Sequence, residues 1–140
     1  MTSTDTAETI RYTADVVVTT TNGHVLLIER GWDPHKGQWA LPGGHVDPDE
    51  TSRAAAVREL AEETAVYAQP DELDQIGVFD RPDRDPRGRY VTVAYHLTVI
   101  PGLPTEAGHD AVNVRWWPLN NLPPLAFDHA NIIRAALRAA

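Results

Sequence analysis

The sequence predicts an α+β fold in which a β-sheet is sandwiched between helices. Strand-like, β-branched segments lie on both sides of one central helical pattern, and a second helical pattern closes the chain. Prolines and glycines separate these segments. At 140 residues the chain fits one domain with its own core. We therefore expect a polar, flexible N-terminus over residues 1–11 and a single domain over residues 12–140.

The strands are predicted from runs of β-branched and aromatic residues bounded by turn signals. Asn22-Gly23 is a two-residue hairpin signal between the first two strands. A loop containing Pro34 precedes the third strand, which ends at a Pro-Gly-Gly turn. In chain order, the predicted strands span residues 12–20, 24–30, 38–41, 73–79, 90–100 and 114–117.

Two segments have helical patterns. Residues 48–64 contain Asp49 as the expected N-cap and alanines in the middle. Residues 126–138 form a second, alanine-rich helix. The strands lie before and after the first helix in sequence, which favours a sheet covered by helices.

Composition excludes several classes of protein. The chain has no cysteine, so it has neither disulfides nor thiolate metal sites. No apolar run approaches the roughly 20 residues that span a bilayer, and the polar start does not resemble a signal peptide, so we expect a cytoplasmic protein without membrane contact. A net charge of -8 argues against binding of long nucleic acid. A phosphate-bearing substrate would be repelled by this charge unless the excess acids held a divalent cation.

Three carboxylates are concentrated on one helix. Glu59, Glu62 and Glu63 stand at positions i, i+3 and i+4, which places them on one face. Clustered carboxylates suit Mg²⁺ or Mn²⁺, with water and substrate phosphate completing the coordination. Arg58 and Glu50, eight residues apart, are expected to pair and to orient these ligands. The alternative is a solvated helix face with an incidental arginine.

The surrounding residues resemble the Nudix box, a signature of 23 positions that spans residues 44–66. The approach Trp39-Ala40-Leu41-Pro42-Gly43 is also similar to the strand and turn before that box. The resemblance covers essentially the whole chain and implies the Nudix fold, an α/β/α sandwich with a mixed central sheet. The matching positions are Gly44, Glu50, Arg58-Glu59-Leu60, Glu62-Glu63 and Val66.

The resemblance implies a metal-dependent hydrolase that cuts a diphosphate joined to another group. Glu59, Glu62 and Glu63 would hold Mg²⁺ or Mn²⁺ together with the Gly44 carbonyl. Glu62 or Glu63 would be the general base, or a loop carboxylate would take that role. Two carboxylates before the last predicted strand match that loop, Asp110 first and Glu106 second. Both could instead cap a surface turn.

One position departs from the box. Ala65 stands where the family usually has glycine, which ends the helix in a left-handed conformation. Alanine in that conformation costs roughly 1–2 kcal/mol. Either the helix ends there with strain, or it runs longer and ends differently. Every acidic residue of the box is retained.

The loops would select the substrate. The loop at residues 80–89 has four arginines among prolines, and Arg81 or Arg89 is expected to grip phosphate or a ribose hydroxyl. Trp32 and Phe79 are expected to stack on a base, and Arg30 is a further candidate contact. A solubilising loop is the alternative for the arginines, and core or rim packing for the aromatics.

Within the family, ADP-ribose pyrophosphatases are similar in carrying a proline about sixteen residues past the box, where this chain has Pro82. Their similarity extends to residues 85–95 and 122–130. We therefore expect hydrolysis of ADP-ribose to AMP and ribose 5-phosphate. A nucleoside triphosphate pyrophosphohydrolase that clears damaged nucleotides, a dinucleotide or nucleotide-sugar pyrophosphatase, and a non-catalytic ADP-ribose sensor are the alternatives. Relatives with this activity are often dimers, so a homodimer is a further implication.

Overall fold

The computed structural model describes residues 7–108 and 111–140. These residues form seven strands, two α-helices and one 3₁₀ turn. No helix in these two ranges is long and apolar enough to span a membrane. The elements are β1 (Ile10–Thr20), β2 (His24–Arg30), β3 (Trp39–Ala40), β4 (Gly43–His45), α1 (Ser52–Thr64), the 3₁₀ turn η1 (Pro70–Glu72), β5 (Asp74–Phe79), β6 (Arg89–Val99), β7 (Ala111–Pro118) and α2 (His129–Ala139).

The sheet is mixed. The strands β1 and β6 pair in parallel, in a register that runs from Ile10 opposite Arg89 to Thr20 opposite Val99. All other pairs are antiparallel: β5 with β6, β4 with β1, and β2 with β1, β3 and β7. The first strand therefore lies at the centre of the sheet, where it contacts both halves of the chain.

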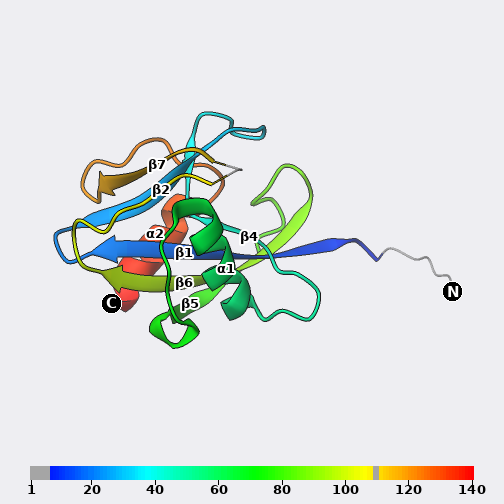
Figure 1. Cartoon of the computed structure of the whole chain (residues 1–140). Helices are drawn as coiled ribbons and strands as arrows, with labels where there is room; N and C mark the ends of the chain where they lie inside the picture. Colours follow the sequence, from blue (N-terminus) through cyan, green and yellow to red (C-terminus); the bar gives the residue numbers. More distant parts are fainter. Residues whose placement is uncertain (1–6, 109–110) are drawn as a thin grey trace, which may run out of the picture.

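The two helices cover opposite faces of the sheet, with α1 in front of β1 and α2 behind it in Figure 1. Successive residues of a strand point to opposite faces. Accordingly, Val16 and Val18 pack in one core with Leu60 of α1. Val17 packs in the other core with Ile132 of α2. The predicted α/β/α sandwich is confirmed.

The helix α1 begins later than predicted and ends in the strained conformation. Its N-cap is Thr51, whose Oγ1 accepts a hydrogen bond of 3.0 Å from the Ala54 N–H. Asp49, the predicted N-cap, lies before it in a turn with φ of 66°. At the other end, Ala65 has φ of 62° and ψ of 22°, and its N–H donates to the Ala61 carbonyl. The alanine therefore adopts the left-handed conformation that glycine takes most readily.

Several strand boundaries differ from the prediction. The first strand begins two residues earlier, at Ile10, and the last is longer than predicted. The sequence does not predict the strand β4, because a Gly-Gly pair has low strand propensity. A Cβ on Gly43 would lie 2.3 Å from the Ala14 carbonyl oxygen, so only glycine allows this close pairing. The last helix begins at His129 rather than residue 126, since Phe127 has φ of 54° and does not continue a helix.

Candidate active site

Arg58 connects most of the acidic residues that the box contributes. Its Nε and Nη2 donate to the two oxygens of Glu50 at 2.8 and 2.9 Å, and its Nη1 donates to Glu59 at 2.7 Å. Nη2 also donates to the His45 carbonyl at 3.0 Å, which ties α1 to β4. Glu62 lies farther away, at 3.4 Å. The expected pairing of Arg58 with Glu50 is present.

This pairing has clear electrostatic consequences. The hydrogen bond from Arg58, followed by one from the Asp47 N–H, lowers the pKa of Glu50 to about 2. The hydrogen bond to Glu50 in turn raises the pKa of Arg58. Both groups are therefore charged at neutral pH. Their bidentate geometry fixes the guanidinium beside Glu59.

Glu63 is held against the glycine strand. Its side chain is buried, and Oε1 accepts a hydrogen bond of 2.7 Å from the Gly43 N–H. Gly44 leaves space for the neighbouring carboxylate, because a Cβ there would lie 2.4 Å from the carboxyl carbon of Glu59. The two glycines thus allow α1 to place Glu59 and Glu63 directly beside β4.

These residues have the chemistry of a divalent-cation site. Glu59, Glu63 and Gly44 line one pocket, whereas the Glu62 side chain is 58% exposed. Among residues 7–108 and 111–140, no group of three or more His, Asp or Glu side chains is arranged as a preformed metal cage. Mg²⁺ does not need such a cage, because it usually binds one or two carboxylates and keeps several waters and substrate phosphates. The donor set fits that mode of binding.

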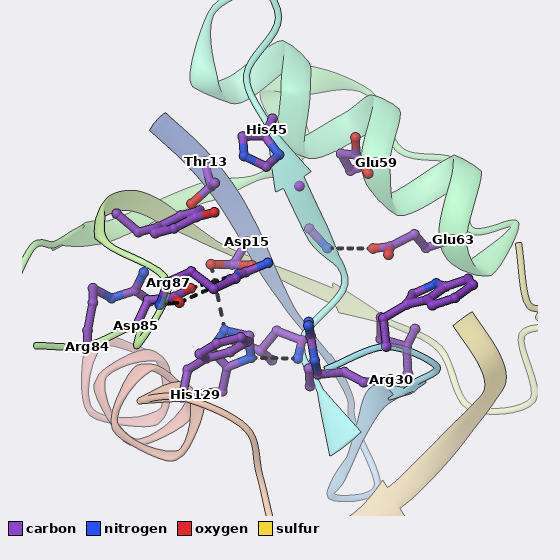
Figure 2. A pocket seen from close by; sticks show the side chains of 18 of the residues that line it. Thr13, Asp15, Arg30, His45, Glu59, Glu63, Arg84, Asp85, Arg87 and His129 are labelled. Carbon is purple, nitrogen blue, oxygen red and sulfur yellow. Dashed lines mark hydrogen bonds and ion pairs between the residues drawn. The ribbon is translucent and has the colours of Figure 1, made fainter. Parts of the chain in front are cut away.

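The pocket beside these carboxylates has a volume of about 300 Å³ and extends across the sheet towards the start of α2 (Figure 2). Its lining comes from segments far apart in the sequence: β1, the end of β2, the Gly-Gly strand, α1, the loop before β6 and the residues before α2. Besides Glu59, Glu63 and the two glycines, the polar and aromatic groups that line it are Thr13, Asp15, Arg30, Trp32, His45, Asp47, Arg84, Asp85, Arg87, Tyr90, Phe127 and His129.

The loop before β6 forms one wall of the pocket. Arg84 donates to both carboxylate oxygens of Asp128, at 2.9 and 2.6 Å, and so fastens the loop to the start of α2. Asp85 is buried, and burial alone would raise its pKa. Hydrogen bonds from the side chain and the N–H of Arg87 outweigh burial and lower that pKa. The carboxylate therefore stays ionised and holds the Arg87 guanidinium in place.

Two arginines approach Phe127 from different parts of the chain. The guanidinium of Arg30 lies 4.9 Å from the ring centroid and that of Arg87 lies 5.4 Å from it. Arg30 also donates through Nε to the Pro34 carbonyl at 2.8 Å. Burial, and then repulsion by Arg87, lowers the pKa of Arg30. An anionic ligand between these cations would relieve their repulsion.

The other expected substrate contacts lie elsewhere. Trp32 lines the pocket and is 67% exposed. Phe79 packs against the core beneath α2 and does not line this pocket. Arg81 lines a second hollow, which shares Arg84 and Phe127 with this pocket, and pairs with Asp83 at 3.4 Å. Arg89 donates to Glu8 at 3.1 Å.

Within the arginine-rich loop, the structure therefore brings Arg84 and Arg87 to the pocket instead of Arg81 and Arg89. The count of arginines pointed to the loop, but nothing in the spacing tells which of them point inward. Asp15 and His129 were also missed. A charged residue inside the β-branched first strand was an available signal for Asp15.

A second loop is tied to the C-terminal end of α1. The Glu106 N–H donates to the Thr64 carbonyl at 2.8 Å, and the Gly108 N–H donates to the Glu63 carbonyl at 3.1 Å. A Cβ on Gly108 would lie 1.9 Å from the Glu62 carbonyl oxygen, so the contact requires glycine. Asp110, the expected loop carboxylate, lies outside the described residues.

Comparison with known proteins agrees with this geometry. The NUDIX domain model matches residues 9–136. An ADP-ribose pyrophosphatase of Methanocaldococcus jannaschii is 46% identical over 81% of this chain and 66% of its own length. The ADPR responsive transcriptional repressor NtrR of Acinetobacter baylyi is 34% identical over 80% of this chain and 46% of its own. This chain thus spans less than two thirds of the length of either relative.

Solved structures give the same result. The NUDIX domain of Shewanella oneidensis NrtR, complexed with ADP-ribose, has a TM-score of 0.87 and 33% identity over 95% of this chain and 90% of its own. A bifunctional NMN adenylyltransferase/ADP ribose pyrophosphatase of Francisella tularensis, complexed with AMP and a Mn ion, has a TM-score of 0.84 and 32% identity over 96% of this chain and 43% of its own. The fold, the carboxylate helix and the match along most of the sequence together show that this chain belongs to the Nudix family.

Proposed function

We propose that this chain hydrolyses ADP-ribose to AMP and ribose 5-phosphate in a reaction that requires Mg²⁺. The observation that carries the proposal is the single pocket that joins the carboxylates of α1 to the paired arginines near Phe127. A diphosphate could lie beside the carboxylates while the groups attached to it extend along the pocket. The similarity to an ADP-ribose pyrophosphatase and to a Nudix domain complexed with ADP-ribose supports this substrate.

Glu59 and Glu63 would hold the metal, with Glu62 and the Gly44 carbonyl as the further expected ligands. The Mn ion in the Francisella neighbour supports a divalent cation, and hard oxygen donors favour Mg²⁺. When bound, such a cation neutralises charge on the diphosphate and lowers the pKa of the attacking water. Arg58 and Glu50 keep Glu59 in position through the contacts described above.

Arg30 and Arg87 are the proposed phosphate contacts, because both guanidiniums face the pocket and repel each other without an anion. Trp32 is exposed at the pocket and offers a flat surface for a base. Phe79, Arg81 and Arg89 are not part of this proposal.

For the general base we propose Asp110 first and Glu106 second, with Glu62 or Glu63 as the alternatives within the box. The loop that leads to Asp110 is fastened to the carbonyls of Thr64 and Glu63. This contact supports a loop carboxylate close to the end of α1.

A second candidate function is binding of ADP-ribose without hydrolysis, which the similarity to an ADP-ribose-responsive repressor favours. The net charge of -8 argues that this chain itself does not bind long nucleic acid. Retention of Glu59, Glu62 and Glu63, with Arg58 in place among them, argues for catalysis.

The experiment compares ADP-ribose with NADH, a diadenosine polyphosphate, GDP-mannose and the nucleoside triphosphates at fixed Mg²⁺. Products are separated by chromatography. We expect a kcat/KM for ADP-ribose that exceeds the others by at least about 10-fold, with AMP as product. If the enzyme preferred a nucleoside triphosphate and released pyrophosphate, the substrate would be that triphosphate and not ADP-ribose. Tight binding of ADP-ribose without turnover in Mg²⁺ or Mn²⁺ would identify a sensor.

A further inference from the structure

A buried carboxylate on β1 forms part of the floor of the pocket and has no role in the proposed hydrolysis. The Asp15 side chain is only 10% exposed and lies beside the Gly-Gly strand, since Asp15 is the sheet partner of Gly43 (Figure 2). A Cβ on Gly43 would lie 2.2 Å from Asp15 Oδ1, so the glycine leaves room for this carboxylate. The only hydrogen bond that the described residues donate to it comes from Thr92 Oγ1 to Oδ2, at 2.7 Å.

The neighbouring histidine does not neutralise Asp15. Nδ1 of His129 accepts a hydrogen bond of 2.9 Å from the Leu41 N–H, so the proton of the neutral ring is on Nε2. That nitrogen lies 4.0 Å from Asp15 Oδ2, beyond hydrogen-bonding distance. Burial lowers the pKa of His129, which keeps the ring neutral. His129 therefore presents a neutral dipole to Asp15 instead of a cation.

A carboxylate has about four lone-pair sites, and Thr92 occupies one of them. Burial of a carboxylate with so few donors is costly. The part of Asp15 that is not covered by protein opens into the pocket. A ligand that places a hydrogen-bond donor there would replace a hydrogen bond from water that the carboxylate lost on burial.

The pocket lining contains both positive and negative side chains. The guanidiniums of Arg30 and Arg87, which both lie near Phe127, suit a phosphate, whereas the Asp15 carboxylate would repel a phosphate placed next to it. Asp85 is not an equivalent acceptor, because the Arg87 side chain already binds both of its oxygens. Among the described pocket residues, Asp15 combines burial, negative charge and an almost unfilled set of acceptor sites.

We propose that Asp15 accepts a hydrogen bond from a neutral donor group of the substrate, and so selects a molecule with a hydroxyl or amino group at a set distance from its diphosphate. A further phosphate in the same place is rejected. This inference rests on the proposed function. ADP-ribose offers two sources of such a donor: the amino group of adenine and the hydroxyls of the terminal ribose.

The test measures dissociation constants by calorimetry in EDTA, where the proposed metal-dependent reaction does not run. The ligands are ADP-ribose, IDP-ribose, which lacks the amino group of the base, and the methyl ester of ADP, which lacks the terminal sugar. In the wild type, we expect the analogue without the donor to bind about 10–100-fold more weakly, as expected for loss of a hydrogen bond to a charged group.

The same ligands are then titrated into Asp15→Asn, with Asp71→Asn as a control on the exposed 3₁₀ turn, which does not line the pocket. In Asp15→Asn we expect the discrimination against that analogue to fall at least about 10-fold, and in the control to stay unchanged. The analogue that shows the effect identifies the base or the sugar as the donor. Equal discrimination in wild type and Asp15→Asn for both analogues would overturn the inference.

Two controls separate the possible failures. If Asp15→Asn does not fold, as judged by circular dichroism and thermal melting, the wild type still decides: binding of both analogues within about threefold of ADP-ribose would overturn the inference. Turnover of ADP-ribose by the wild type in Mg²⁺ is measured separately. Selective binding of ADP-ribose without turnover would refute the proposed hydrolysis but would still support the role of Asp15 in binding. Turnover without discrimination between the ligands would support the hydrolysis and refute the role of Asp15. Neither binding nor turnover of ADP-ribose would overturn both.

Discussion

The Glu63 side chain has both a structural contact and a place in the pocket. It lines the pocket and accepts a hydrogen bond from the Gly43 N–H that helps to hold β4 against α1. A glutamine in its place retains an oxygen for that hydrogen bond but loses the negative charge that a metal needs. The structural and chemical contributions of this residue can therefore be separated by one substitution.

We expect Glu63→Gln to lower kcat for ADP-ribose by more than about 100-fold while the thermal melting temperature in EDTA stays close to that of the wild type. Steady-state kinetics and thermal melting measure the two effects. Asp71→Asn, which removes an exposed carboxylate away from the pocket, is the control and should change neither. Retention of wild-type kcat by Glu63→Gln would exclude Glu63 from catalysis and from metal binding.

For the loop carboxylates, we expect Asp110→Asn to lower kcat with a smaller effect on metal binding, because a general base transfers a proton and does not coordinate the cation. Glu106→Gln provides the comparison, since Glu106 is the second candidate. Kinetics and Mg²⁺ titration are measured for both variants. An unchanged kcat in Asp110→Asn would remove Asp110 from the mechanism, and a fall in kcat confined to Glu106→Gln would assign the role to Glu106.

The Glu50–Arg58 pair predicts a pH dependence of stability. The pKa of Glu50 is lowered from 4.5 to about 2 in the folded protein. A carboxylate whose folded pKa is depressed stabilises the fold above its unfolded pKa and loses this contribution as pH falls towards the folded pKa. The difference in free energy of unfolding between wild type and Glu50→Gln should therefore be constant above about pH 5.5 and shrink between about pH 4.5 and 2.

Urea unfolding in EDTA across this range measures that difference, with EDTA excluding metal binding. In a protein that already carries Arg58→Met, the effect of Glu50→Gln on the free energy of unfolding should depend much less on pH. The reason is that the hydrogen bond from Arg58 is the main cause of the lowered pKa of Glu50. A difference that is independent of pH down to about pH 2.5 would show that the pair does not contribute as described.

At the level of elements, the stability of α1 depends on the conformation of its C-terminal end. Ala65 has φ of 62°, a conformation that costs an alanine roughly 1–2 kcal/mol. Directly before it, the carbonyls of Thr64 and Glu63, the last two of the helix, accept hydrogen bonds from the N–H groups of Glu106 and Gly108. These contacts hold the end of the helix, and with it Glu63, despite the strained alanine.

We expect Ala65→Gly to raise the free energy of unfolding by about 1 kcal/mol, because glycine adopts this conformation without a steric penalty. Urea unfolding measures the change. The matched control is Ala54→Gly, at an exposed position inside α1, where the same substitution should lower stability by about 0.5–1 kcal/mol. Destabilisation by both glycines would show that the end of the helix is not strained at Ala65.

At the scale of the whole molecule, one ion pair joins segments 44 residues apart. Arg84 and Asp128 are 5% and 13% exposed, and they connect the wall of the pocket to the start of α2. Removal of one partner from a buried pair leaves the other charge without compensation. The stability of the domain and the shape of the pocket therefore depend on the same contact.

We expect Arg84→Gln and Asp128→Asn each to lower the free energy of unfolding by about 3–5 kcal/mol, and the double variant to lose less than the sum. The matched pair Arg81→Gln and Asp83→Asn, in the same loop but 73% and 74% exposed, should each change stability by less than about 1 kcal/mol. Urea unfolding and KM for ADP-ribose are the measurements. Additive losses for the buried pair would contradict the coupling.

The sequence alone was sufficient for the fold class and the carboxylate helix. Both depend on local patterns: alternation in the strands, the spacing of Glu59, Glu62 and Glu63, and the pairing distance between Glu50 and Arg58. The boundaries of α1 and α2 were less accurate, because Asp49 and Phe127 adopt positive φ values that no local pattern announces.

The composition of the pocket was decided by the tertiary structure. Asp15, Arg84, Arg87 and His129 come from three segments that meet only when β1 lies at the centre of the sheet and α2 closes one face. Phe79, by contrast, is partly buried and packs against the core beside α2. Spacing along one helix is set by its own hydrogen bonds and can be read locally. Which side chains of a loop point inward depends on long-range contacts such as Arg84 with Asp128, and those exist only in the folded chain.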